Sequence, residues 1–413
     1  MTHSITVAAS WDQVQNMIFD RHAQLLPVHP GKNPGYAYFT GNMVDTVSWM
    51  WHVCRSGIAV SIRQSKVALF VPFCNPHYQN NWNTSVKALL PEGGLPPNQW
   101  WANGWLLCGD QVPKQLLGDN GFCAILNMLL VSCQDGGMCD CDFVINKRDS
   151  ACVRLDGCDP MNPMEPYQQP MMRPPLVPVL SQYVGDQFAD IAMPLASDWH
   201  RLSRGTFHGQ KPLAPVRLPQ DVPWTQKKDC AIFRGSMTGT GAHAGTHQRL
   251  ALLHYHDGVN FDIKGTGCNA RMRYCPLEKW LTVPCCEGYD IGKHNYVPLH
   301  MQQETYRYSI VADGHSGADR LAALAGGQQV VFKIEPPVHA LCPDTWASKR
   351  MHAWEHYIPV ERRMANLPYH LTWARENEPA CKRILHNCSV WSAAERQRII
   401  AWWREFSSKA ACP

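Results

Sequence analysis

Two glycine-rich segments in the second half of the chain contain residue types that bind phosphate. The first, Phe233 to Gly241, reads FRGSMTGTG and lies between an expected strand and an expected helix containing Arg249. Small residues there let backbone N–H groups and the hydroxyls of Ser236 and Thr238 approach an anion. Arg249 could then donate two hydrogen bonds to one phosphate. An ordinary glycine-rich turn is the alternative, and the Gly-Lys-Ser/Thr ending of a P-loop is missing from this segment.

The second segment, Asp313 to Arg320, reads DGHSGADR and again follows an expected strand and opens an expected helix. Gly314 frees the backbone, Ser316 offers a hydroxyl, and Arg320 lies one turn into the helix. Two such turns in one domain would suit a diphosphate. The alternative is that Asp313 and Ser316 only cap the helix.

A candidate general base lies in the first half of the chain. Residues 144–149 read VINKRD, an apolar strand that ends in polar residues. Ligands of open α/β sheets bind outside the carboxyl ends of strands, where Asp149 would lie. A carboxylate there can accept the proton of an attacking hydroxyl. In the alternative interpretation, Asp149 pairs with Arg148 or caps a turn.

Two further patterns resemble ligand sites. Asp140-Cys-Asp142 matches the Asp-x-Asp sequence that holds a divalent metal in one class of glycosyltransferases, but it precedes its strand, which favours a loop feature. Residues 265–270, GTGCNA, resemble a dinucleotide fingerprint after a strand, but Pro276 would interrupt the following helix.

Cysteines and histidines also cluster, without the C-x-x-C pairs or spacing of a zinc module. We interpret them as structural thiols and as surface or loop histidines: Cys133, Cys139, Cys141, Cys152 and Cys158, and His243, His247, His254 and His256.

Alternating elements must position these residues. In the first half we expect a helix over 10–26 capped by Ser10, a hairpin over 57–72, a helix over 122–131 and a strand over 143–146. In the second half we expect strands and helices in alternation, which predicts an α/β domain with a largely parallel sheet. Those expected strands cover 230–233, 259–263, 308–312 and 330–334, and the expected helices cover 246–255 and 319–325.

Length and composition limit the class of protein. A chain of 413 residues is expected to form two domains, and 45% hydrophobic residues fit a packed globular protein. A net charge of +4 without a basic run argues against nucleic-acid binding. The longest apolar stretch, 122–133, is too short to span a bilayer, and no export signal is recognisable, so a cytoplasmic protein with reduced thiols is expected.

Taken in order, several segments resemble glycosyltransferase family 90, which includes protein O-glucosyltransferases and fungal capsule-associated xylosyltransferases. The resemblance covers roughly residues 142–387 and rests on 144–149, 190–194 (DIAMP), 233–236 with Thr238 and Arg249, 308–314 with Arg320, and 356–360 (HYIPV). It implies a GT-B fold, two Rossmann-like domains facing each other across a cleft. We expect an acceptor-side domain over 1–215, a nucleotide-sugar domain over 216–385, and a C-terminal helix over 386–413 that could pack back on the first domain.

The resemblance also implies an activity, namely transfer of xylose or glucose from a UDP-sugar to a hydroxyl of a glycan or glycoprotein, with inversion and without a metal or cofactor. Asp149 falls where the family places its catalytic base. The donor site is expected to comprise Phe233, Arg234, Gly235, Ser236, Thr238, Arg249, Asp313, Gly314, Ser316 and Arg320.

Two alternatives to this activity remain at this stage. One is a metal-dependent transferase that uses Asp140 and Asp142, and the other is a non-catalytic glycan- or nucleotide-binding relative. Many relatives belong to the secretory pathway, whereas this sequence starts without a signal. It therefore resembles the members found in large DNA viruses of algae, which would place it in the host cytoplasm.

Overall fold

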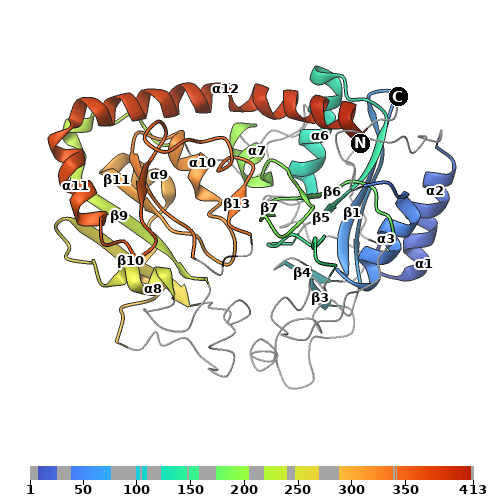
Figure 1. Ribbon diagram of the computed structural model, residues 1–413, viewed down its shortest axis with the longest axis horizontal. Helices are drawn as coiled ribbons and strands as arrows, with labels where there is room; N and C mark the ends of the chain where they lie inside the picture. Colours follow the sequence, from blue (N-terminus) through green and yellow to red (C-terminus); the bar gives the residue numbers. More distant parts are fainter. Residues whose placement is uncertain are drawn as a thin grey trace. The chain divides into compact units, whose positions relative to one another are not determined.

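A computed structural model of the protein describes residues 8–25, 39–75, 99–102, 105–108, 122–146, 148–157, 174–203, 218–239, 247–268, 288–337, 340 and 342–410 (Figure 1). Within it the chain divides into two compact units. Unit 1 contains Met1–Val216 and Arg396–Pro413, and unit 2 contains Arg217–Glu395.

The described part of unit 1 begins with a helical segment, and strands and further helices follow. Its elements are α1 (Trp11–Val14), the π-helix η1 (Gln15–Phe19), α2 (Asp20–Ala23), α3 (Met43–His52), β1 (Ser56–Arg63), β2 (Lys66–Cys74), β3 (Gln99–Ala102), β4 (Trp105–Cys108), α6 (Phe122–Gly136), β5 (Cys141–Asn146), β6 (Val179–Ser181), β7 (Tyr183–Val184), β8 (Ile191–Ala192) and α7 (Ala196–Leu202).

The main sheet of unit 1 has the order β2-β1-β5-β6-β8. Strand β1 pairs antiparallel with β2 and β5, whereas β5, β6 and β8 run parallel. The expected hairpin is confirmed, and its turn residues Gln64 and Ser65 have φ of 51° and 55°. Positive φ at both turn residues matches the right-handed twist of the flanking strands. The expected first helix is also confirmed, with the Ser10 side chain accepting a hydrogen bond from the Gln13 backbone.

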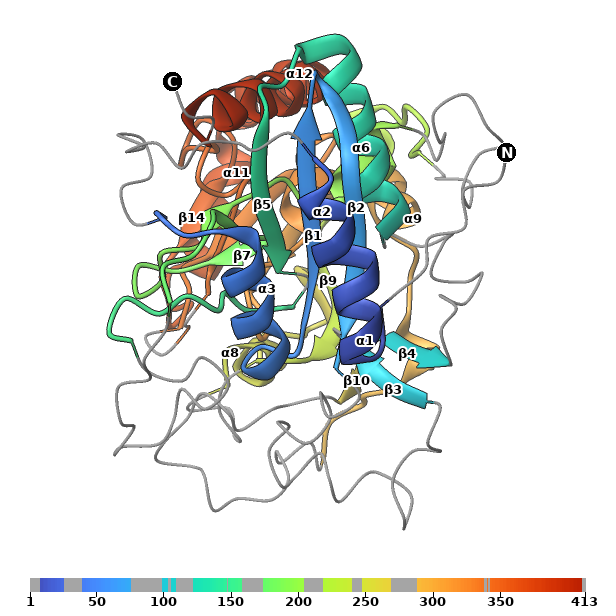
Figure 2. The same ribbon diagram turned by 90° about the vertical axis from the view of Figure 1, so that its right-hand side faces the viewer.

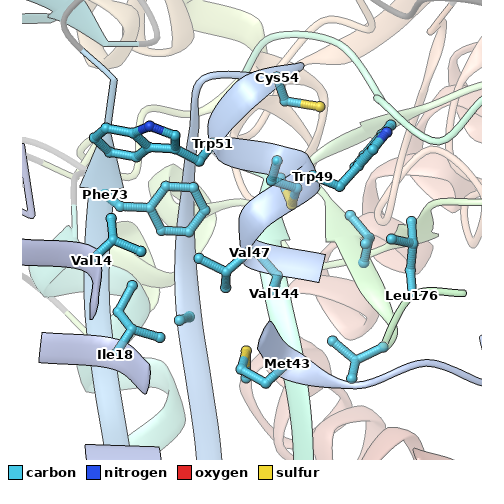
Figure 3. Packing of buried hydrophobic residues seen from close by; sticks show 14 of the residues in the cluster. Val14, Ile18, Met43, Val47, Trp49, Trp51, Cys54, Phe73, Val144 and Leu176 are labelled. Atoms are coloured by element: carbon cyan, nitrogen blue, oxygen red, sulfur yellow. The ribbon is translucent and has the colours of Figure 1, made fainter. Parts of the chain in front are cut away.

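Helices α1 and α3 cover one face of this sheet (Figure 2). Val14 and Ile18 from the first helical segment and Val47 from α3 pack with Phe73 of β2 and Val144 of β5 (Figure 3). Burying each such side chain stabilises the fold by roughly 1.5–3 kcal/mol.

Phe143 precedes Val144 in β5 and therefore points to the opposite face of the sheet. Its ring centroid lies 5.7 Å from that of Trp403 and 5.2 Å from that of Phe406, both in α12 (Glu378–Ala410). β5 is thus packed on both faces, and this fixes the position at which its carboxyl end emerges.

Strands and helices alternate along unit 2. Its described elements are η3 (Trp224–Gln226), β9 (Lys228–Met237), α8 (Gln248–Leu253), β10 (Phe261–Cys268), η6 (Lys293–Asn295), α9 (Leu299–Thr305), β11 (Tyr306–Val311), α10 (Arg320–Ala325), β12 (Val330–Ile334), β13 (Asp344–Thr345), β14 (Ile358–Val360), α11 (Leu367–Glu376) and the first part of α12.

The five strands of the unit 2 sheet have the order β10-β9-β11-β12-β14, and all neighbouring pairs are parallel. The predicted α/β class with a largely parallel sheet is confirmed. The chain runs from β9 outward to β10 and then crosses back to β11, so the winding direction reverses between β9 and β11. Open α/β sheets bind ligands at the carboxyl ends of the strands beside such a reversal.

The strand expected over 259–263 extends further than expected, and the dinucleotide fingerprint discounted at residues 265–270 is not formed by the described part of that segment. Residues 265–268 do not form a turn after a strand, because β10 continues through Cys268 and pairs with β9 as far as Met237. A glycine-rich segment inside a paired strand cannot wrap a phosphate as a dinucleotide turn does. Asn269 and Ala270 lie outside the described residues.

None of the helices in the described part of the chain is long and apolar enough to cross a lipid bilayer.

Candidate functional site

Arg249 connects the turn after β9 to the turn after β11. Its Nη1 donates to the carbonyl oxygen of Ser236 (2.8 Å) and to the hydroxyl of Thr238 (2.7 Å). Its Nε donates to the carbonyl oxygen of Asp313 (3.1 Å), and its Nη2 to that of Ala312 (2.8 Å). Since a guanidinium has five N–H donors, these bonds occupy most of its capacity. The side chain therefore fixes the two turns against each other.

Arg320, at the start of α10, places a second guanidinium beside the first. Its Nη1 donates to the carbonyl oxygen of Arg234. The Cζ atoms of Arg249 and Arg320 each lie 5.8 Å from the centroid of the Phe233 ring, so one aromatic ring serves both cations.

The electrostatics of the pair favour an anion. Burial and then the charge of Arg320 lower the pKa of Arg249 to about 10, and burial also lowers the pKa of Arg320. A bound anion would relieve the repulsion between two partly desolvated cations. These carboxyl ends of β9 and β11 are therefore suited to a phosphate or diphosphate.

Two glycines make the close approach of the turns possible. A Cβ on Gly314 would lie 2.6 Å from Oγ1 of Thr238 and 3.1 Å from Nη2 of Arg249. Gly239 has a φ of +146°, which favours glycine, and its N–H donates to Nδ1 of His315 (3.3 Å). A side chain at Gly314 would separate the turn after β9 from the turn after β11.

Asp313 supports the second turn from inside. Its Oδ1 accepts a hydrogen bond from the backbone of Ala318 (2.9 Å), which precedes the N-cap residue Asp319, so Asp313 closes the turn and does not cap α10. Its Oδ2 is buried and hydrogen-bonds to no described residue, and burial raises the pKa of this carboxyl group. The turn after β11 is therefore held by an acidic side chain that lies near the cations Arg249 and Lys333.

The Arg234 side chain points away from the arginine pair, because strand residues alternate between the faces of a sheet. Its Nη2 donates to Oδ1 of Asp262 in β10 (2.7 Å), and the other carboxylate oxygen of Asp262 accepts from the Tyr306 hydroxyl (2.5 Å). The hydrogen bonds from Tyr306 and Arg234 outweigh the effect of burial and lower the pKa of Asp262. Arg234 thus contributes its carbonyl oxygen to the site, whereas its guanidinium ties β9 to β10.

Most of the expected donor residues come together in unit 2. Contacts link Phe233, Gly235, Thr238, Arg249, Asp313, Gly314 and Arg320. Ser236 and Ser316 are half-buried, and their hydroxyls make no hydrogen bond within the described residues. Strand β9 extends to Met237, further than expected, so the turn begins at Thr238. Thr240 and Gly241 lie outside the described residues.

Asp149 lies at the tip of a turn after the carboxyl end of β5. Asn146 holds this turn. Its Nδ2 donates to the carbonyl oxygen of Ser150 (2.7 Å) and to the hydroxyl of Ser181 (2.9 Å), and its Oδ1 accepts from the Arg148 backbone (3.1 Å). The side chain of Asp149 is exposed and forms no ion pair or hydrogen bond with any described residue. Its carboxylate is therefore accessible to a substrate hydroxyl.

The structure does not contain the pair between Asp149 and Arg148 that was the alternative for Asp149. Arg148 is buried and donates from Nη1 to the Cys54 carbonyl oxygen (3.2 Å) instead of pairing with Asp149. Sequence reasoning missed Asn146 as the residue that shapes the turn. An asparagine directly after an apolar strand is a turn-forming signal that could have indicated it.

Asp190, in the 190–194 segment, anchors the chain behind this turn. Its carboxylate accepts from the backbones of Cys152 (2.9 Å) and Val153 (2.6 Å) and from the Ser181 hydroxyl (2.5 Å). Burial raises its pKa in spite of these bonds. The segment therefore positions the loop after Asp149.

The Asp-x-Asp segment lies at the opposite end of β5. Asp142 accepts two hydrogen bonds from Arg63 (2.9 and 3.1 Å) and one from His22 (2.8 Å). Burial alone would raise its pKa, but the bonds from His22 and Arg63 lower the pKa to about 2. Asp140 accepts from the Gln64 backbone in the hairpin turn (2.6 Å). Both carboxylates therefore have structural partners, and the described residues contain no group of three or more potential metal ligands.

A parallel α/β sheet with cationic turns beside its winding reversal is suited to a phosphorylated ligand. The profile of glycosyl transferase family 90 matches residues 121–404, and the chain belongs to this family.

The relatives of the chain include viral and animal proteins. It is 28% identical to "Uncharacterized protein 027R" of Frog virus 3 (isolate Goorha), across 82% of this chain and 38% of that protein. It is 24% identical to "Uncharacterized protein 179R" of Invertebrate iridescent virus 6, across 85% of this chain and 35% of that protein. Human protein O-glucosyltransferase 3 is 29% identical across 51% of this chain and 37% of the human protein. The chain thus spans little more than a third of the length of these relatives.

Proposed function

We propose that the protein transfers xylose or glucose from a UDP-sugar to a hydroxyl of a glycan or glycoprotein, with inversion at the anomeric carbon. Membership of glycosyl transferase family 90 supports sugar transfer. The similarity to a protein called an O-glucosyltransferase supports a hydroxyl acceptor and makes glucose one of the two candidate sugars.

The observation that carries this proposal is the pair of guanidiniums at the carboxyl ends of β9 and β11. A UDP-sugar presents a diphosphate with two negative charges, which matches two adjacent cations. Arg320 contacts the diphosphate directly. Its guanidinium makes only one hydrogen bond to the described residues, so its other N–H groups can donate to phosphate oxygens. Arg249 holds the turns in place and adds its charge to the local potential.

Asp149 acts as the general base in the proposed reaction. As the acceptor oxygen attacks the anomeric carbon, its proton passes to the Asp149 carboxylate. The new carbon–oxygen bond forms while the bond to the diphosphate breaks, and UDP leaves with the electron pair. The arginines and backbone N–H groups stabilise the charge that grows on the leaving diphosphate.

The positions of the charged side chains support metal independence. Two guanidiniums lie at the carboxyl ends of β9 and β11, where the diphosphate is expected, whereas the carboxylates of Asp140 and Asp142 are engaged with Gln64, Arg63 and His22. Releasing Asp142 for a metal would leave a largely buried arginine without its partner, which is costly.

We further propose that unit 2 binds the nucleotide-sugar and unit 1 supplies the base and the acceptor surface, in a GT-B arrangement. Asp149 belongs to unit 1 and both arginines to unit 2. A reaction that needs all three residues requires the two units to act on one pair of substrates.

The test is a thermal-shift screen against UDP, GDP, CMP and NAD, each with and without EDTA. A ligand that binds the native state raises the melting temperature. We expect UDP alone to raise it by several degrees, equally with EDTA. A shift with NAD only, or with none of the four, would contradict the donor assignment, and an EDTA-sensitive UDP shift would contradict metal independence.

A further inference from the structure

Tyr296, directly after η6 in unit 2, has an exposed ring without an aromatic neighbour. Three aromatic side chains of the described residues are largely exposed, Tyr296 at 65%, Trp354 at 48% and Tyr369 at 66%. Trp354 contacts the rings of His370 and Trp373, and Tyr369 contacts that of His370. No ring contact involves Tyr296 within the described chain. Its ring faces are therefore open to a ligand.

The backbone that carries Tyr296 is fixed to β10 in spite of this exposure. The N–H of Gly292 and the Nδ2 of buried Asn295 both donate to the Gly265 carbonyl oxygen, at 3.1 and 3.2 Å. A Cβ on Gly265 would lie 2.8 Å from Cγ1 of Ile291, so the glycine permits this approach. The N–H of Tyr296 donates to the carbonyl oxygen of Lys293 in η6 (3.1 Å). The ring is thus exposed on a fixed support, which lowers the entropy cost of using it in binding.

Register places this support beside Arg320. Gly265 of β10 pairs with Gly235 of β9, and paired residues of adjacent strands present the same face of the sheet. A Cβ on Gly235 would point toward Nη2 of Arg320, at 3.4 Å, just as a Cβ on Gly265 would point toward Ile291. Arg320 and the 291–296 segment therefore cover one face of the sheet, one strand apart.

The electrostatics agree with this placement. Burial lowers the pKa of Arg320, and the phenol of Tyr296 acts in the opposite direction together with Asp319.

We propose that Tyr296 stacks on the nucleobase of the nucleoside diphosphate whose phosphates contact Arg320. This inference rests on the proposed donor site and adds the residue that receives the base. A nucleobase has two flat faces and stacks on aromatic rings. The transferred sugar has to reach an acceptor and the base Asp149 of unit 1, so the nucleotide end of the donor is the part that stays on unit 2.

The experiment compares UDP with inorganic pyrophosphate, which has the charge but lacks the base, by titration calorimetry on the full chain. Tyr296→Ala should weaken UDP binding between about five-fold and a hundredfold, the range of a lost base–aromatic stack. Pyrophosphate affinity and the melting temperature of the unliganded protein should stay at the values of the unchanged protein. Tyr296→Phe, which keeps the ring, should bind UDP normally.

Tyr369→Ala is the matched control, because Tyr369 is equally exposed and belongs to the same unit. It should leave UDP affinity unchanged. Unaltered UDP binding by Tyr296→Ala, or an equal loss for UDP and pyrophosphate, would overturn the stacking role. If the unchanged protein bound no UDP, the donor site itself would be refuted before any variant was compared, and the stacking role with it.

Discussion

The carboxyl ends of β5 and β9 are built in opposite ways. After β5, a single asparagine hydrogen-bonds the turn closed, and Asp149 is left exposed without a partner among the described residues. After β9, the guanidinium of Arg249 donates hydrogen bonds to the protein itself and links the turn after β9 to the turn after β11. One end therefore presents an available acid, and the other presents a rigid cationic surface.

The two ends of β5 extend the comparison. Asp142 lies near the start of β5 and Asp149 in the turn after its carboxyl end, yet Asp142 is enclosed by Arg63 and His22 whereas Asp149 is accessible. A carboxylate that is saturated with hydrogen bonds stabilises the fold, and one without partners can exchange a proton with a substrate. The environment, and not the residue type, separates structural from reactive acids here.

The largest expected effect is at Asp149. Asp149→Asn removes the proton acceptor at little cost in volume, so sugar transfer should fall by about 10² to 10⁴, the usual contribution of a general base. UDP affinity should be unchanged, since the substitution lies in unit 1. The measurement is the rate of sugar transfer together with UDP titration. Asp186→Asn, at another exposed position of unit 1, is the control and should transfer normally. Turnover of Asp149→Asn near that of the control would remove Asp149 from the mechanism.

Substitutions of Arg249 and Arg320 should have different effects on stability and on UDP binding. Arg249→Met strips the hydrogen bonds from the carbonyl oxygens of both turns and should destabilise the protein by about 3 kcal/mol, as loss of a buried charged partner does. Arg320→Ala loses a single hydrogen bond to the protein and the contact with the Phe233 ring, and should reduce the free energy of unfolding by about 1.5 kcal/mol.

The same Arg320 variant should nevertheless weaken UDP binding by about tenfold or more, because it removes a charged contact to the diphosphate. Urea-induced unfolding and UDP titration of both variants measure the difference. If Arg320→Ala proved as destabilising as Arg249→Met and bound UDP normally, the division between a binding and a positioning arginine would be reversed.

The last prediction concerns Asp142 and depends on pH. Its pKa is lowered from 3.8 to about 2 in the folded protein. A depressed carboxyl pKa contributes stability above the unfolded value and loses it as the pH falls toward the folded value. Asp142→Asn should therefore cost about 2 kcal/mol at pH 7, and this difference should shrink between about pH 4 and pH 2.

Unfolding of both proteins by urea across that pH range provides the measurement. Asp135→Asn, which breaks an exposed pair with Arg396, is the control and should have little effect at any pH. A difference for Asp142→Asn that does not change with pH would show that the ion pair is not its source.

Local patterns were sufficient for much of the fold. The hairpin around Gln64 and Ser65, the capped helix after Ser10 and the alternation in unit 2 all follow from short-range periodicity and turn chemistry. Sequence reasoning ended this strand at residue 263, before Gly265, because a glycine run is compatible with both a turn and a strand, and only the pairing of β10 with β9 distinguishes them.

The sequence by itself determined which residues could do chemistry, because glycine, hydroxyl and arginine patterns and the order of the family motifs are properties of the chain. Only the tertiary structure decided which of them have partners. Arg234 turns toward Asp262, Arg249 toward four backbone and hydroxyl oxygens, and Arg320 keeps a single such bond. The physical reason is that hydrogen bonding and burial of a side chain depend on neighbours from distant parts of the sequence, such as β10 and β11 around β9. The spacing of residues along the sequence does not specify which side chains those neighbours will contact.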